Sequence, residues 1–131
     1  MADLSYVDTS ALVKLVVAEP ESWALGEAIR ERTLLSSDLA RVELVRTIRQ
    51  LGLGSGALER ASRVLARVAF HRVQRRILER AAVLEPPRLR SLDAIHLATA
   101  LTIPELSAFI TYDRRLGSAA EQVGLSVLAP V

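Results

Sequence analysis

Short apolar runs alternate along this chain with longer segments of helical periodicity, and no other feature of the sequence constrains the fold as strongly. Apolar runs of about four residues are typical of strands that are buried on both faces. Five strands are predicted, at residues 4–7, 33–36, 70–73, 108–111 and 126–128, of which 70–73 has poor strand character because it contains histidine and arginine. Because strands that alternate with helices form parallel sheets, the sequence predicts an α/β fold in which helices cover both faces of a mostly parallel sheet.

The intervening helices are predicted from their periodicity and from the residues at their ends. They are expected from residue 11 until Pro20 ends the first of them, and then at 21–32, 39–51, 74–84, 92–101 and 114–123, with a further helix that starts at residue 57. The predicted N-caps are Thr9 or Ser10, then Ser37 or Asp38, and then Ser91, because their side-chain oxygens can accept hydrogen bonds from free backbone N–H groups. Proline or glycine follows most of these segments and is expected to end them.

The length and composition suit one globular domain over residues 1–131. Hydrophobic residues make up 50% of the chain and charged residues 24%, and no internal repeat is visible. No apolar run approaches the length of about 20 residues that a bilayer span requires. The start of the chain also lacks the basic and then apolar pattern of an export signal. We therefore expect a soluble, cytoplasmic protein without membrane association.

The chain can build only certain kinds of metal site. It has no cysteine, which excludes disulfides and thiolate zinc sites, and its two histidines cannot supply a three-histidine zinc site. A metal would therefore have to be held by carboxylates. Oxygen ligands of this kind favour hard cations such as Mg²⁺ or Mn²⁺.

The net charge of +2 conceals an uneven distribution. Residues 1–40 carry three basic and seven acidic side chains, residues 41–90 carry twelve and four, and residues 91–131 carry two and four. The basic middle part could face RNA, another partner or solvent, since charge alone does not select among them.

Three aspartates stand beside predicted strand ends or helix starts. Asp8 follows the first strand, Asp113 follows the fourth, and Asp93 lies in the first turn of a helix. Each could simply cap a helix or interact with its dipole. In a parallel α/β sheet, however, the carboxyl ends of the strands form the edge where ligands bind. Asp8 and Asp113 are therefore expected at that edge, and Asp93 near it.

Glu43 is the fourth acid of interest because it lies inside a helix between apolar residues. A carboxylate near the buried side of a helix is costly unless it is paired or bound to a metal. An ion pair with Arg41 or Arg46 is one explanation. The other is that Glu43 joins the three aspartates, whose mutual repulsion would require a cation.

Around these acids the chain resembles PIN-domain ribonucleases of the VapC toxin type. The resemblance rests on residues 6–15, 42–46, 92–100 and 110–116, which occur in the family's order and spacing and contain the four acids. It implies a single PIN domain, a three-layer α/β/α arrangement with the parallel sheet order 3-2-1-4-5, and endoribonuclease activity that depends on Mg²⁺ or Mn²⁺. It further implies a homodimer and inhibition by a small VapB-type antitoxin.

The resemblance also assigns roles to individual residues. It carries the acidic quartet over to Asp8, Glu43, Asp93 and Asp113, with Asp8 and Asp93 as the closest matches to direct metal ligands. The predicted supporting residues are Ser10 and Thr111 as donors to the ligands, Arg114 and Arg115 as phosphate contacts or solvated charges, and His96 as a packed or supporting side chain rather than a ligand.

Other functions are open to the same sequence. A PIN nuclease that processes RNA or DNA without being a toxin is one, and a catalytically inactive binding module is another, although no acid of the quartet is missing. An aspartyl phosphatase would usually carry a second acid two residues after Asp8, where this chain has Ser10. The RNA target and its cleavage sequence do not follow from the sequence.

Overall fold

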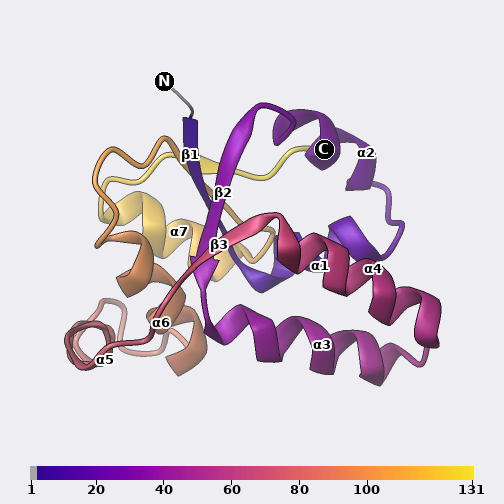
Figure 1. Cartoon of the computed structure of the whole chain (residues 1–131). Coiled ribbons are helices and arrows are strands. Elements are labelled where there is room, and N and C mark those ends of the chain that lie inside the picture. Colours follow the sequence, from indigo (N-terminus) through magenta and orange to yellow (C-terminus); the bar gives the residue numbers. More distant parts are fainter. Residues whose placement is uncertain (1–2) are drawn as a thin grey trace.

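Five parallel strands form one sheet in the computed structural model, which describes residues 3–131 (Figure 1). The strands are β1 (Asp3–Val7), β2 (Arg32–Ser37), β3 (Val68–His71), β4 (Ala108–Ile110) and β5 (Val127–Leu128). Their order across the sheet is β3-β2-β1-β4-β5, and every neighbouring pair is parallel. The predicted α/β class and strand order are therefore confirmed. The first two residues of the expected domain lie outside the described part of the chain.

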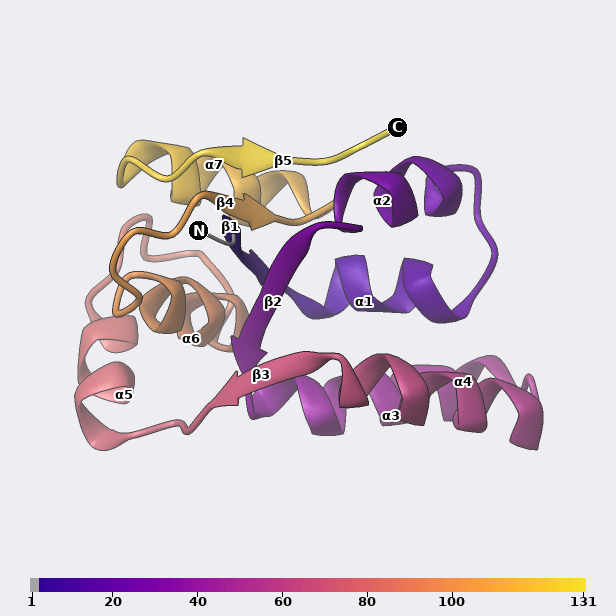
Figure 2. The same ribbon diagram turned by 45° about the horizontal axis from the view of Figure 1, so that its top comes forward.

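Helices lie on both sides of this sheet and complete a three-layer arrangement (Figure 2). The helices α1 (Thr9–Val16), α2 (Ser22–Ala28), α3 (Leu39–Leu51) and α4 (Ser55–Ala66) are on one side. The helices α6 (Ser91–Ala100) and α7 (Arg114–Gln122) are on the other, and α5 (Arg75–Ala82) packs against α6. In residues 3–131 no helix is long and apolar enough to span a membrane.

Successive residues of the central strands point to opposite faces, and this divides the core in two. Val7 of β1 and Ile110 of β4 pack with the helices α1–α4. Tyr6 and Phe109, one residue earlier in each strand, pack with α6 and α7. The rings of Tyr6 and Phe109 are stacked with centroids 5.2 Å apart, and both are fully buried.

Several element boundaries differ from the prediction. The third strand was expected at 70–73 but lies at Val68–His71, because β3 takes its register from Leu34–Ser37 of β2. The second helix ends at Ala28 instead of residue 32, since Arg32 already belongs to β2. The fourth helix begins two residues early, at Ser55.

Two predicted helix caps are also wrong. Asp8 caps α1 with its carboxylate, in place of Thr9 or Ser10. Ser91 already belongs to α6, and the N-cap residue Arg90 makes no side-chain capping bond. For α3 the capping oxygen belongs to Ser37, which accepts from the Leu39 N–H at 3.2 Å.

Candidate active site

Asp8 lies at the centre of the sheet's carboxyl edge, directly after β1. Its side chain is 3% exposed and accepts three hydrogen bonds. Oδ1 accepts from Ser10 Oγ at 2.7 Å and from the Ala11 N–H at 3.0 Å, and Oδ2 accepts from Thr111 Oγ1 at 2.6 Å. Burial raises the pKa of Asp8 in spite of these donors. A buried carboxylate that is held so firmly stabilises the start of α1 and presents negative charge at the sheet edge.

Ser10 and Thr111 link the segments that follow β1 and β4. Besides its bond to Asp8, Ser10 Oγ accepts from the Tyr112 N–H at 2.9 Å. Thr111 Oγ1 accepts from the Asp113 N–H at 3.1 Å. The two hydroxyls therefore hold Asp8 and the backbone of Asp113 in a fixed relation, across about a hundred residues of sequence.

Glu43 extends from the second turn of α3 towards the same edge and is half-buried. Its Oε1 accepts from Thr9 Oγ1 at 2.6 Å and lies 2.7 Å from His96 Nε2. Burial raises the pKa of Glu43, but the contacts with His96 and Thr9 outweigh this effect and the net shift is downward. The alternative of an ion pair with a neighbouring arginine is wrong for Arg41, which pairs with Asp38 at 3.3 Å.

Asp93 and Asp113 line one cavity beside these groups. It has a volume of about 370 Å³ and is lined by Leu89, Arg90, Asp93, Asp113, Arg114 and Arg115. Burial raises the pKa of Asp93 to about 6, and the negative charges of Asp113, Asp8 and Glu43 contribute to the rise. The other three acids of the quartet therefore each act electrostatically on Asp93. Asp113 also caps α7, since its Oδ1 accepts from the Leu116 N–H at 3.0 Å.

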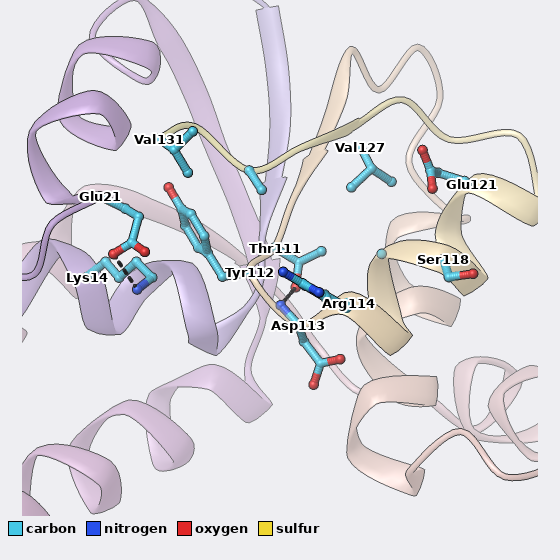
Figure 3. A pocket seen from close by; sticks show the side chains of 12 residues that line it. Lys14, Glu21, Thr111, Tyr112, Asp113, Arg114, Ser118, Glu121, Val127 and Val131 are labelled. Carbon is cyan, nitrogen blue, oxygen red and sulfur yellow. Dashed lines mark hydrogen bonds and ion pairs between the residues drawn. The ribbon is translucent and has the colours of Figure 1, made fainter.

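A second cavity of about 480 Å³ lies on the other side of the start of α7 (Figure 3). Thr111, Asp113 and Arg114 contribute to its lining, together with Tyr112 and the last strand. In Figure 3 the Asp113 carboxylate points away from Tyr112. Arg114 lines both cavities and therefore lies where they adjoin.

The donors at this edge have the chemistry expected for a hard divalent cation. Four carboxylates, from three helix starts and one helix interior, lie at or near this edge, with arginines beside Asp93 and Asp113 and no ion pair between any of the four and an arginine in residues 3–131. As the side chains stand, no three His, Asp or Glu residues of the described chain form a ready-made metal cluster. Burial and the charges of the other three acids raise the pKa of Asp93, as expected where carboxylates lie close enough to repel one another.

Two side chains at this edge received no role from the sequence. Tyr6 was predicted only as part of a strand and Thr9 only as a cap, yet both belong to the hydrogen-bond network around Glu43. Their contacts join residues that are 34 to 90 positions apart. The one sequence signal was the position of Thr9 directly beside Asp8.

Comparison with known proteins identifies relatives over nearly the whole chain. A family model described as the PIN domain matches residues 5–122. Ribonuclease VapC46 of Mycobacterium tuberculosis is 46% identical over 127 residues, which cover 95% of this chain and 96% of the relative. Ribonuclease VapC35 of the same organism is 46% identical over 131 residues, with the same coverage.

Solved structures share the fold at much lower sequence identity. The crystal structure of Mycobacterium tuberculosis VapC20, described as a sarcin-ricin loop cleaving toxin, has a TM-score of 0.75 and 16% identity, and the match covers 96% of this chain and 99% of that one. A toxin–antitoxin complex from Klebsiella pneumoniae has a TM-score of 0.69 and 20% identity, with coverage of 97% and 98%. At these identities the likeness concerns the fold.

Proposed function

Since this chain belongs to the PIN-domain family, among its VapC-type ribonucleases, we propose that it is a toxin that cuts RNA with Mg²⁺ or Mn²⁺ held by four carboxylates. The proposed ligands are Asp8, Glu43, Asp93 and Asp113. Burial, and after it the negative charges of Asp113, Asp8 and Glu43, raise the pKa of Asp93 to about 6, and this grouping of acids is the observation that carries the proposal. A site that concentrates negative charge in this way favours a cation.

The protein's own residues prepare the site in two ways. Ser10 and Thr111 donate to Asp8 and hold its carboxylate in one orientation. Arg90, Arg114 and Arg115 line the same cavity as Asp93 and are suited to contact RNA phosphates on either side of the bond to be cut. A bound divalent cation supplies charge neutralisation at the phosphate and lowers the pKa of a coordinated water.

The proposal extends to the partners of the protein. We expect RNA as the substrate, a VapB-type antitoxin as the inhibitor, a homodimer as the assembly and the cytoplasm as the location. The curated relatives named VapC support the antitoxin and the RNA substrate. A PIN nuclease of RNA or DNA processing is the alternative function, and the presence of all four acids argues against an inactive binding module.

Removal of divalent metal is expected to abolish RNA cleavage, because four carboxylates alone would repel the RNA phosphate. The purified protein would be incubated with total RNA in EDTA and then with added Mg²⁺ or Mn²⁺, and the products separated on a denaturing gel. We expect cleavage only after metal is added. Asp8→Asn, purified in parallel, controls for contaminating nucleases. Cleavage in EDTA, or equal cleavage by Asp8→Asn, would contradict the proposal.

A further inference from the structure

A continuous chain of hydrogen-bonded groups runs from the core of the protein to Glu43. The Tyr6 hydroxyl lies 2.6 Å from His96 Nδ1, and His96 Nε2 lies 2.7 Å from Glu43 Oε1. Tyr6 is 0% exposed and His96 is 1% exposed. A series of polar groups inside a core is costly to bury unless each group has a hydrogen-bond partner. The direction of donation along this series and the group at its end therefore bear on its function.

The protonation of the Tyr6 hydroxyl determines which groups donate in these hydrogen bonds. Burial raises the pKa of this phenol, so it keeps its proton. Within residues 3–131 it forms a hydrogen bond of 2.6 Å with His96 Nδ1, and it can accept from the Ser36 side chain and the Ser37 backbone, so its own proton is left for Nδ1. The hydroxyl therefore donates to Nδ1, and a neutral His96 must carry its proton on Nε2 and donate it to Glu43. Tyr6 thus selects the tautomer of the ring that faces the acidic site.

The two donors at Glu43 converge on the same oxygen. Thr9 Oγ1 donates to Oε1 at 2.6 Å, and His96 Nε2 donates to Oε1 as well. In residues 3–131 no hydrogen bond is found at Oε2. A carboxylate whose one oxygen accepts two short hydrogen bonds has a fixed orientation, and its other oxygen remains available to a cation or a coordinated water.

The buried end of this hydrogen-bonded series, the Tyr6 ring, is held rigidly. The Tyr6 ring stacks on Phe109 with an interplanar angle of 2° and meets the edge of the His96 ring at 76°. Tyr6 lies on β1 in the centre of the sheet, and His96 lies on α6. Glutamate has three rotatable side-chain bonds. Hydrogen bonds from rigid neighbours reduce the conformational entropy that Glu43 would otherwise lose when a cation binds.

We propose that Tyr6 and His96 are positioning residues that, with Thr9, hold Glu43 by Oε1 and leave Oε2 for the metal site. This inference rests on the proposed function, because it assigns these residues to the same carboxylate site. It predicts two separable effects. One concerns the His96 tautomer in metal-free protein, and the other concerns metal affinity.

The tautomer is measured by ¹⁵N NMR of the histidine rings in metal-free protein, with His71→Gln to assign the two histidines. We expect His96 in the Nε2–H form in the wild type. Tyr6→Phe keeps the ring stack and removes only the donor to Nδ1, so we expect the preference for this tautomer to weaken. A wild-type His96 in the Nδ1–H form would overturn the proposal, whether or not any variant folds.

Metal affinity is measured by calorimetric titration of Mn²⁺ into the protein without RNA. Tyr6→Phe is expected to weaken Mn²⁺ binding by about tenfold, as is typical of groups that orient metal ligands. In the Glu43→Gln background the same substitution should have no further effect, because its action passes through Glu43. If Glu43→Gln binds Mn²⁺ too weakly to measure, the ¹⁵N NMR measurement of the His96 tautomer decides whether the proposal holds.

Tyr112→Phe is the matched control, since it also removes one phenol hydroxyl and one hydrogen bond, at 2.8 Å to the Pro130 carbonyl. We expect Mn²⁺ affinity within about twofold of the wild type. Equal losses in Tyr6→Phe and Tyr112→Phe, or an undiminished loss in the Glu43→Gln background, would overturn the proposal. Failure to cleave RNA would instead refute the proposed function, since neither measurement uses RNA.

Discussion

Asp93→Asn is expected to lower RNA cleavage by a factor of about 10³ or more while leaving the fold intact. The reason is that a carboxylate ligand contributes several kcal/mol through the cation it holds, and each 1.36 kcal/mol corresponds to about tenfold in rate. Asp93 lies in the first turn of α6 and lines the cavity that it shares with Asp113. The measurement is the initial rate of cleavage of a labelled RNA in Mg²⁺, with circular dichroism to verify the fold.

The same substitution should raise the melting temperature of the metal-free protein. The pKa of Asp93 is raised to about 6, so its ionised form is disfavoured in the folded state. The wild type therefore loses stability as the pH rises from about 4 to about 6. Asparagine does not ionise, so the Asp93→Asn variant does not lose stability in this pH range. Because Asp93 is partly exposed, solvent reduces the gain to about 1 kcal/mol, or about 3–6 °C.

Thermal melts in EDTA at pH 4 and pH 7.5 test the sign of this effect. The difference between Asp93→Asn and the wild type should be largest at pH 7.5 and small at pH 4. A variant that is less stable than the wild type at pH 7.5 would show that Asp93 is held by favourable partners. The electrostatic basis of the proposed site would then be wrong.

Phe109→Ala is expected to lower the free energy of unfolding by about 3–5 kcal/mol, the usual cost of a cavity left by a buried aromatic ring. Phe109 is fully buried on β4 and stacks on Tyr6 between the sheet and the helices α6 and α7. Its loss removes packing from the layer that also supports His96. Urea denaturation followed by fluorescence or circular dichroism gives the free energy directly.

Phe70→Ala supplies a matched control for this effect. Phe70 lies on the edge strand β3, is only partly buried, and stacks under the Arg41 guanidinium at 4.1 Å. We expect a loss of about 1 kcal/mol, since less apolar surface is exposed by the change. If Phe109→Ala cost no more than Phe70→Ala, the assignment of the core on the α6 and α7 side would be contradicted.

The features that follow from local sequence were predicted well. Three of residues 4–7 are hydrophobic and Asp8 follows them directly, so a buried strand followed by a carboxylate could be predicted from neighbouring residues alone. The alternation of strands and helices likewise indicated a parallel sheet, and the family resemblance supplied the strand order.

Features that depend on contacts between residues far apart in the sequence could not be predicted from neighbouring residues. The position of β3 is set by its pairing with Leu34–Ser37, which places Val68 and Ala69 in the strand and leaves residues 72 and 73 outside it. The contact between Tyr6 and His96 joins residues 90 positions apart, and the contact between His96 and Glu43 spans 53. Neither pair has a periodicity or spacing that would reveal it in one sequence.

A crystal structure of the protein grown with Mn²⁺ tests whether Asp8, Glu43, Asp93 and Asp113 hold a divalent cation together at the carboxyl edge of the sheet, because anomalous diffraction locates the ion. We expect an anomalous peak in contact with carboxylate oxygens of Asp8 and Asp93, with Glu43 and Asp113 bound directly or through water. An edge without a peak under saturating Mn²⁺, or a peak held by other residues alone, would contradict the proposed metal site.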